Sequence, residues 1–192
     1  MKPRQKPSVI IVYTGDGKGK TSASIGLVVR ALGVGWRVAF VQFIKSWTVS
    51  EHKFFAKIQP LFGDQFVFYK GGKGFVNLGE HSAHDKKSGA EISFTEHRRA
   101  AQETLNFAQT CVSSGKFDLV VCDEINNAVV EKLITTDDLR ALLDARNRKT
   151  SLCLTGRNWP AELNDRADII TNMTKTKHHF DEGFLANVGI DY

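Results

Sequence analysis

The stretch that most limits how this chain can fold is residues 12–21, with the sequence VYTGDGKGKT. A β-branched run precedes the glycines, and apolar residues at helical spacing follow them. Glycines allow successive main-chain N–H groups to turn towards an anion, and a helix start adds a favourable dipole. A lysine then binds phosphate oxygens, and a hydroxyl binds Mg²⁺. The pattern predicts a strand, a phosphate-binding loop (P-loop) and a helix, rather than a merely glycine-rich turn, with these nucleotide contacts: Gly15, Asp16, Gly17, Lys18, Gly19, Lys20, Thr21 and Ser22.

The spacing of this loop differs from the usual P-loop. Four residues ordinarily separate the first glycine from the Gly-Lys pair, which would require glycine where this chain has Thr14. Starting from Gly15, the loop is one residue shorter. The difference argues against ordinary hydrolysis of a terminal phosphate more than it argues against nucleotide binding.

Strand-like and helix-like segments alternate along the chain. Such alternation is typical of a mostly parallel sheet covered by helices on both faces. The sequence therefore predicts an α/β fold with about six strands in one domain, 1–192. The expected strands are 9–13, 37–43, 65–69, 118–122, 151–155 and 168–171.

Helical periodicity marks the segments between these strands. One apolar face contains Ile25, Val28, Val29 and Leu32, and Gly33 and Gly35 follow as stop signals. A longer helix is expected over 93–112, with a Ser93–Glu96 capping box and the apolar face Phe94, Ala101, Leu105, Ala108 and Val112. Further helices are expected from about Thr135 and at Pro160. Residues 70–89 form a glycine-rich loop in this interpretation, and 173–192 an irregular tail.

An acidic pair stands at the end of the fourth expected strand. The run DLVVCDE at 118–124 places Asp123 and Glu124 where a carboxylate can approach a metal held by a P-loop. Hydrophobic runs ending in acids also occur at ordinary strand ends. The nearby P-loop favours the metal-linked interpretation.

Composition excludes several classes of protein. The net charge of +5 comes from 26 basic and 21 acidic residues, but no basic run exceeds two neighbours, so an anionic small ligand explains it without nucleic acid. The apolar runs are too short to cross a bilayer, and we expect a soluble, cytoplasmic protein. We expect the three cysteines, Cys111, Cys122 and Cys153, to be buried, and the neighbouring histidines His81, His84 and His97 to be exposed without forming a metal site.

Several short motifs occur in order along nearly the whole chain: GDGKGKT, VQFIK at 41–45, VVCDE at 120–124, LTGR at 154–157, KHHFDEG at 177–183 and a terminal GIDY. Together they resemble the ATP:corrinoid adenosyltransferases of the P-loop type. The shortened loop, the TGR and the terminal GIDY are the specific parts of this resemblance.

The resemblance implies a RecA-like P-loop fold, a homodimer, and ATP lying across the loop in the reverse of the common direction. Reduced cobalt(I) of a corrinoid would attack the 5′ carbon of ATP and release triphosphate, in adenosylcobalamin biosynthesis or salvage. The implied cofactor is Mg²⁺ (or Mn²⁺), and the implied electron donor is a flavoprotein-type reductant.

The resemblance also assigns roles to residues. Lys20 and the loop would hold triphosphate, Thr21 and Glu124 would bind the metal, and Arg30 and Arg157 would be further nucleotide contacts or else ordinary surface ion-pair residues. The family carries Phe-x-Trp in the glycine-rich loop, where it presses on the corrinoid. Here Phe75 matches the first aromatic residue, and Asn77 stands in place of the tryptophan.

Two other functions remain open from the residues alone. A nucleic-acid-stimulated ATPase would fit the fold and the basic charge, although aromatic and basic residues do not interleave as such binding favours. A corrinoid carrier or regulator that binds ATP without turnover would fit Asn77.

Overall fold

The computed structural model describes residues 6–74, 76 and 92–192, and its centre is a six-stranded sheet with every strand pair parallel. The strand order is β3-β2-β4-β5-β1-β6. The predicted α/β class is confirmed. The strands are β1 (Ile10–Thr14), β2 (Val38–Gln42), β3 (Phe66–Lys70), β4 (Leu119–Asp123), β5 (Ser151–Thr155) and β6 (Ile169–Asn172).

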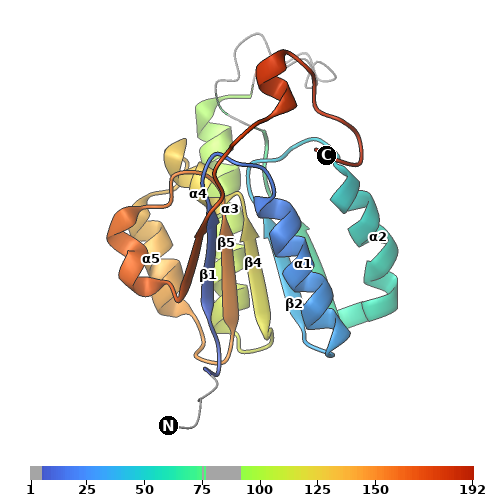
Figure 1. Ribbon diagram of the computed structural model, residues 1–192. Coiled ribbons are helices and arrows are strands. Elements are labelled where there is room, and N and C mark those ends of the chain that lie inside the picture. Colours follow the sequence, from blue (N-terminus) through green and yellow to red (C-terminus); the bar gives the residue numbers. More distant parts are fainter. Residues whose placement is uncertain (1–5, 75, 77–91) are drawn as a thin grey trace, which may run out of the picture.

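Helices cover both faces of the sheet, as Figure 1 shows. Because neighbouring residues of a strand point to opposite faces, the strands supply two apolar layers. One layer packs against α1 (Lys20–Gly33) and α2 (Ser50–Phe62). The other packs against α3 (Phe94–Ser113), α4 (Ile125–Val130) and α5 (Thr136–Ala145).

The six predicted strands lie where the sequence places them, within a residue or two at their ends. The capping box of α3 is present, with the Ser93 hydroxyl accepting the Glu96 N–H at 3.3 Å. Pro160 precedes a short 3-10 helix, Ala161–Arg166. The three cysteines are buried and free, as expected. None of the helices in the described ranges is long and apolar enough to cross a membrane.

Three burial predictions were wrong. Val29 is 57% exposed, because α1 turns Ser24, Val28 and Leu32 towards the sheet and leaves Val29 at the edge of that stripe. Phe94 is 47% exposed in the first turn of α3, and His97, predicted to be exposed, is buried on the inner side of that helix instead. His81 and His84 lie outside the described residues.

Two helices were not predicted. α2 turns only His52 and Phe55 fully inward and contains Pro60, so its sequence lacks a repeated apolar face. α4 has six residues, which is too short for a periodic pattern. The 173–192 tail contains one short 3-10 helix, His179–Glu182, and passes over the carboxyl end of the sheet, shown in red in Figure 1.

A buried polar chain connects α2 to the sheet. The His52 ring contacts the Gln42 side-chain oxygen, and the Gln42 amide donates to Asp123 at 2.9 Å. Burial, together with the nearby Lys70 charge, lowers the pKa of His52 to about 4. His52 is therefore neutral in the folded protein at neutral pH.

We predict that His52 makes folding sensitive to acid. Its pKa in the unfolded chain is about 6.5, so the unfolded chain binds the proton more readily. The stability that neutral His52 contributes is fully present above about pH 6.5 and is lost as the pH falls from 6.5 towards 4. Urea unfolding at about pH 7.5 and about pH 5 gives the free energy of unfolding at each pH. Its decrease between the two pH values should be smaller in His52→Gln than in the parent. Equal losses would contradict this.

A second prediction concerns two glycines. A Cβ on Gly72 would lie 2.2 Å from the Ile44 carbonyl carbon, whereas a Cβ on Gly26, within α1, meets nothing within 4 Å. Gly72→Ala should destabilise the protein because main-chain atoms must move. Gly26→Ala should stabilise it by about 0.5–1 kcal/mol, since alanine favours helix. Thermal unfolding of the two variants checks the opposite signs.

Candidate active site

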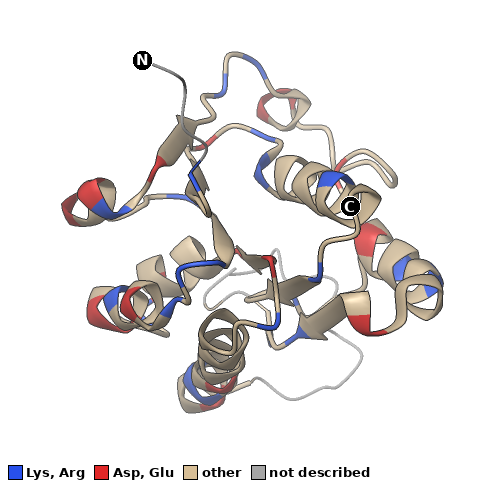
Figure 2. Cartoon of the chain, turned by 90° about the horizontal axis from the view of Figure 1, so that it is seen from below, with Lys and Arg blue, Asp and Glu red and all other residues tan. Residues whose placement is uncertain are grey.

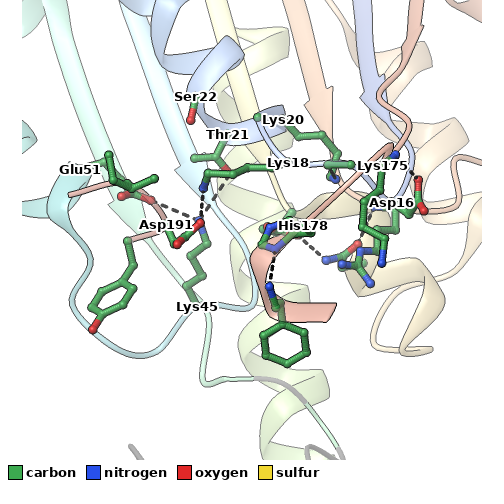
Figure 3. Close-up of a pocket in the computed structure, with 18 of the residues that line it drawn as sticks. Asp16, Lys18, Lys20, Thr21, Ser22, Lys45, Glu51, Lys175, His178 and Asp191 are labelled. Carbon is green, nitrogen blue, oxygen red and sulfur yellow. Dashed lines mark hydrogen bonds and ion pairs between the residues drawn. The ribbon is translucent and has the colours of Figure 1, made fainter. Parts of the chain in front are cut away.

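The candidate site is a cavity of about 1190 Å³ above the carboxyl ends of the parallel strands. Its walls come from the P-loop, the start of α2, α4, the turn after β5, and the tail (Figure 3). Ligands of open parallel sheets ordinarily bind at this end. The order of the sheet puts β5 between β1 and β4, so the turns following all three strands open into the same region.

The P-loop presents the bare amino end of α1 to this cavity. Gly15 and Gly19 have φ of 99° and 111°, values that favour glycine, and Gly19 precedes the helix without a side-chain cap. The first N–H groups of α1 therefore remain available to an anion. Lys20 donates to the carbonyl oxygens of Gly15 at 2.8 Å and Gly17 at 2.7 Å. Burial lowers the pKa of Lys20, with the Glu124 charge acting in the opposite direction.

Asp123, at the end of β4, is a fully buried carboxylate surrounded by donors. Each of these donors comes from a different element, and their distances to its oxygens are 2.7 Å for Thr155 Oγ1, 2.9 Å for Gln42 Nε2, 3.2 Å for Thr21 Oγ1 and 3.5 Å for Lys45 Nζ. Buried charges are retained where they are paired and hydrogen-bonded. Asp123 thus orients the Thr21 hydroxyl rather than facing the cavity itself.

Glu124, the next residue, faces the cavity from a left-handed turn with φ 63°. Its main-chain N–H donates to Thr155 Oγ1 at 2.9 Å, and the Asn127 amide donates to its carboxylate. Burial raises the pKa of Glu124, the Asp123 charge raises it further, and the Lys45 charge opposes the shift. A carboxylate in this setting gains from a nearby cation.

The oxygens of Thr21 and Glu124 fit a hard cation such as Mg²⁺. Within the described residues no cluster of three or more histidine, cysteine or acidic side chains is arranged to hold a metal. Mg²⁺ commonly takes one or two protein oxygens and completes its shell with water and substrate phosphates. The residues present therefore suit a cation that is shared with a bound triphosphate.

The turn after β5 is held by α4. Gly156 has φ 127°, and its carbonyl accepts from the Asn126 amide at 3.2 Å. The Asn127 side-chain oxygen accepts the Arg157 N–H at 2.7 Å. Asn127 therefore links Glu124 and the Arg157 turn, both of which line the cavity.

The structure brings most of the predicted site residues together. Asp16, Lys20, Thr21, Glu124 and Arg157 line one cavity with the rest of the loop from Gly17 to Ser22. Gly15 begins that loop and lines a smaller pocket of about 300 Å³ together with Trp159 and Asn172. Arg30 lies exposed in the last turn of α1, roughly 15 Å along the helix from Lys20, and does not line the cavity among the described residues. Phe75 and Asn77 lie outside the described residues.

Sequence reasoning missed several residues of the site. Lys45 lies beside Thr21 and pairs with Glu51, and three tail groups contact the loop or α2. Lys18 pairs with Asp191 at 2.7 Å, the Lys175 N–H donates to Asp16 at 3.2 Å, and the Ser50 hydroxyl donates to the Tyr192 carbonyl at 2.8 Å. Lys45 and Asp191 stand in the quoted VQFIK and GIDY motifs, which was the available signal.

Known proteins with similar sequences are corrinoid adenosyltransferases. The chain is 30% identical over 190 residues to a corrinoid adenosyltransferase of Pseudomonas aeruginosa, which covers 98% of this chain and 86% of that protein. The corrinoid adenosyltransferase CobA of Salmonella typhimurium is 30% identical, and the match covers 98% of this chain and 88% of that protein. The corrinoid adenosyltransferase of Escherichia coli K12 is 29% identical, and the match covers 96% of this chain and 85% of that protein.

Among solved structures, a KaiC-like protein, PH0186, from Pyrococcus horikoshii OT3 aligns with a TM-score of 0.49 and 12% identity, over 90% of this chain and 75% of that one. The family model described as ATP:corrinoid adenosyltransferase BtuR/CobO/CobP matches residues 6–192. This match, which confirms the resemblance drawn from the motifs, shows that the chain belongs to the ATP:corrinoid adenosyltransferase BtuR/CobO/CobP family and is a corrinoid adenosyltransferase.

Proposed function

We propose that the P-loop holds the triphosphate of ATP so that the 5′ carbon of its ribose, rather than its terminal phosphorus, faces the corrinoid. The observation that carries the proposal is the uncapped start of α1 beside a cavity of about 1190 Å³. Pockets for one small ligand usually measure about 300–1,000 Å³. A larger cavity beside the anion site suits two reactants held side by side.

The lining of the cavity combines phosphate-binding groups with apolar side chains. The floor carries the loop amides, Lys20 and Thr21, which suit phosphates. The lining also includes exposed apolar side chains, namely Phe54 of α2, Val130 of α4, and Phe180 and Ile190 of the tail. Apolar side chains around a phosphate site suit a large, partly apolar second substrate such as a corrin ring.

In the proposed reaction, cobalt(I) supplies an electron pair to the 5′ carbon. The cobalt–carbon bond forms as the carbon–oxygen bond breaks, and triphosphate leaves with the pair from that bond. Lys20 and the loop amides stabilise the charge that develops on the leaving group. Thr21 and Glu124 would hold Mg²⁺, which supplies further positive charge to the triphosphate. The protein's other contribution is to orient the two substrates.

Other features remain proposals that the resemblance supports. Residues 1–192 act as one domain, two chains form a homodimer, a flavoprotein-type reductant supplies electrons, and the enzyme works in the cytoplasm. Phe75 would contact the corrinoid, and Arg157 would contact the nucleotide, as would Arg30 after a rearrangement. Nucleic acid is not a partner in this proposal, since α2, α3 and α5 each carry both basic and acidic residues, and Figure 2 shows red and blue segments on the same helices.

The central test uses prereduced cob(I)alamin with ATP and Mg²⁺. The parent enzyme should form adenosylcobalamin and release intact triphosphate, seen by chromatography and phosphorus NMR. Lys20→Ala should lower the rate at least about 100-fold, since it removes charge from the leaving group. Lys53→Ala, an exposed lysine of α2, serves as control and should leave the rate unchanged. Orthophosphate as the product, or ATP and corrinoid binding without turnover, would reject the proposal.

A further prediction concerns Asn127. Asn127→Ala removes both the donor to Glu124 and the acceptor for the Arg157 N–H. Hydrogen bonds to charged groups contribute about 1.5–3 kcal/mol, so kcat/KM for ATP should fall roughly 10- to 100-fold. The KM for cob(I)alamin should change little. Asn106→Ala, on the exposed side of α3, is the matched control, and an unchanged kcat/KM in Asn127→Ala would contradict the linking role.

A further inference from the structure

Lys45 is a largely buried lysine inside the proposed metal site (Figure 3). Its ammonium nitrogen lies 3.4 Å from Thr21 Oγ1, 3.2 Å from a Glu51 oxygen and 3.5 Å from an Asp123 oxygen. Its side chain is 13% exposed. A fixed positive charge therefore stands beside the hydroxyl expected to bind a divalent cation.

A strained turn directs Lys45 to this position. Ile44 is buried and β-branched, yet its φ is 60°. The Lys45 N–H donates to the Phe43 carbonyl at 2.6 Å, which closes a three-residue turn around Ile44. This positive-φ form is rare and costly for a β-branched residue, and it persists only where its surroundings impose it.

Main-chain hydrogen bonds and close packing hold the turn on both sides. The Phe43 N–H donates to the Asp123 carbonyl at 2.9 Å, which attaches the turn to β4. The Gly74 N–H donates to the Ile44 carbonyl at 2.5 Å, and Gly72 packs against the Ile44 main chain. Lys45 consequently points at Thr21 because of the main-chain path, and not only because of its own ion pairs.

The positive charge of Lys45 would strongly repel a cation bound to Thr21. Mg²⁺ binds oxygen at about 2.1 Å, so a cation on Thr21 Oγ1 would lie within roughly 5.5 Å of the Lys45 nitrogen. At such separations in a partly buried site, like charges repel substantially. We propose that Lys45 keeps divalent cations out of the site until a triphosphate arrives, so that metal and nucleotide enter together.

The charges around the site agree with this order. Glu51 from α2 and Asp123 from β4 pair with Lys45, Glu124 faces the cavity, and Lys20 from the loop adds a second positive charge. Without nucleotide, the lysines offset most of the carboxylate charge. A triphosphate adds several negative charges at once, and the balance then favours a cation. The inference rests on the proposed metal ligands Thr21 and Glu124.

The test is a Mn²⁺ titration of the nucleotide-free, full-length protein, followed by electron paramagnetic resonance of the free ion. The parent should bind Mn²⁺ weakly alone, and with inorganic tripolyphosphate it should lower the free Mn²⁺ signal below the level that the same tripolyphosphate gives without protein. Lys45→Met should bind Mn²⁺ alone at least about tenfold more tightly than the parent. Lys53→Met, which removes an exposed charge from α2, should behave as the parent does. Equal Mn²⁺ affinity in Lys45→Met and the parent would overturn the proposal.

A second variant separates charge from shape. Adding Glu51→Gln to Lys45→Met removes a carboxylate and should return the Mn²⁺ affinity towards that of the parent, whereas a purely steric role predicts no return. If Lys45→Met fails to fold, the parent alone decides the question. Saturation with Mn²⁺ below millimolar concentration without tripolyphosphate would overturn the proposal, and protein-dependent loss of free Mn²⁺ that occurs only with tripolyphosphate would support it.

The adenosylation assay distinguishes failure of this inference from failure of the proposed function. Adenosylcobalamin formation by a parent enzyme that also binds Mn²⁺ tightly without tripolyphosphate rejects only the role of Lys45. The absence of adenosylcobalamin, with the expected Mn²⁺ behaviour, rejects only the proposed reaction.

Discussion

The buried carboxylate of Asp123 sets the arrangement of everything around it. A charge with no exposure to water must be matched by donors, and here the donors come from α1, β2, β5 and the turn that carries Lys45. Satisfying this one group fixes the Thr21 hydroxyl relative to the sheet. Thr155 extends the same network to the main chain of Glu124. The position of the site is therefore built into the core rather than added at its surface.

The order of the strands makes that network possible. Because β5 separates β4 from β1, a single threonine at its end reaches the acidic pair while the P-loop approaches from the far side. All five strand pairs are parallel, so their carboxyl ends coincide. If β4 or β1 were antiparallel, the acidic pair or the P-loop would lie at the opposite edge of the sheet.

The local parts of this structure could be predicted from the sequence, and the long-range parts could not. The β-branched runs and the capping box of α3 act over a few residues, so the strands and that helix were predicted within a residue or two. α2 lacks a repeated apolar face, and the inward turn of His97 depends on what packs beside α3. Among site residues, Lys20 and Glu124 follow from motif spacing. Lys45 reaches Thr21 with the help of an unusual φ at Ile44, which no residue pattern indicates.

The tail has a structural consequence for the glycines of the P-loop. The Gly17 N–H donates to the Met173 carbonyl at 2.7 Å, and a Cβ on Gly15 or Gly17 would collide with main-chain atoms of the tail. These two glycines are therefore needed for packing against the tail, in addition to their proposed role in phosphate binding. In a relative that had lost ATP binding but kept this tail, selection would still retain Gly15 and Gly17 while Lys20 became free to vary. Glycines retained without the lysine would then indicate packing against the tail and would not be evidence of phosphate binding.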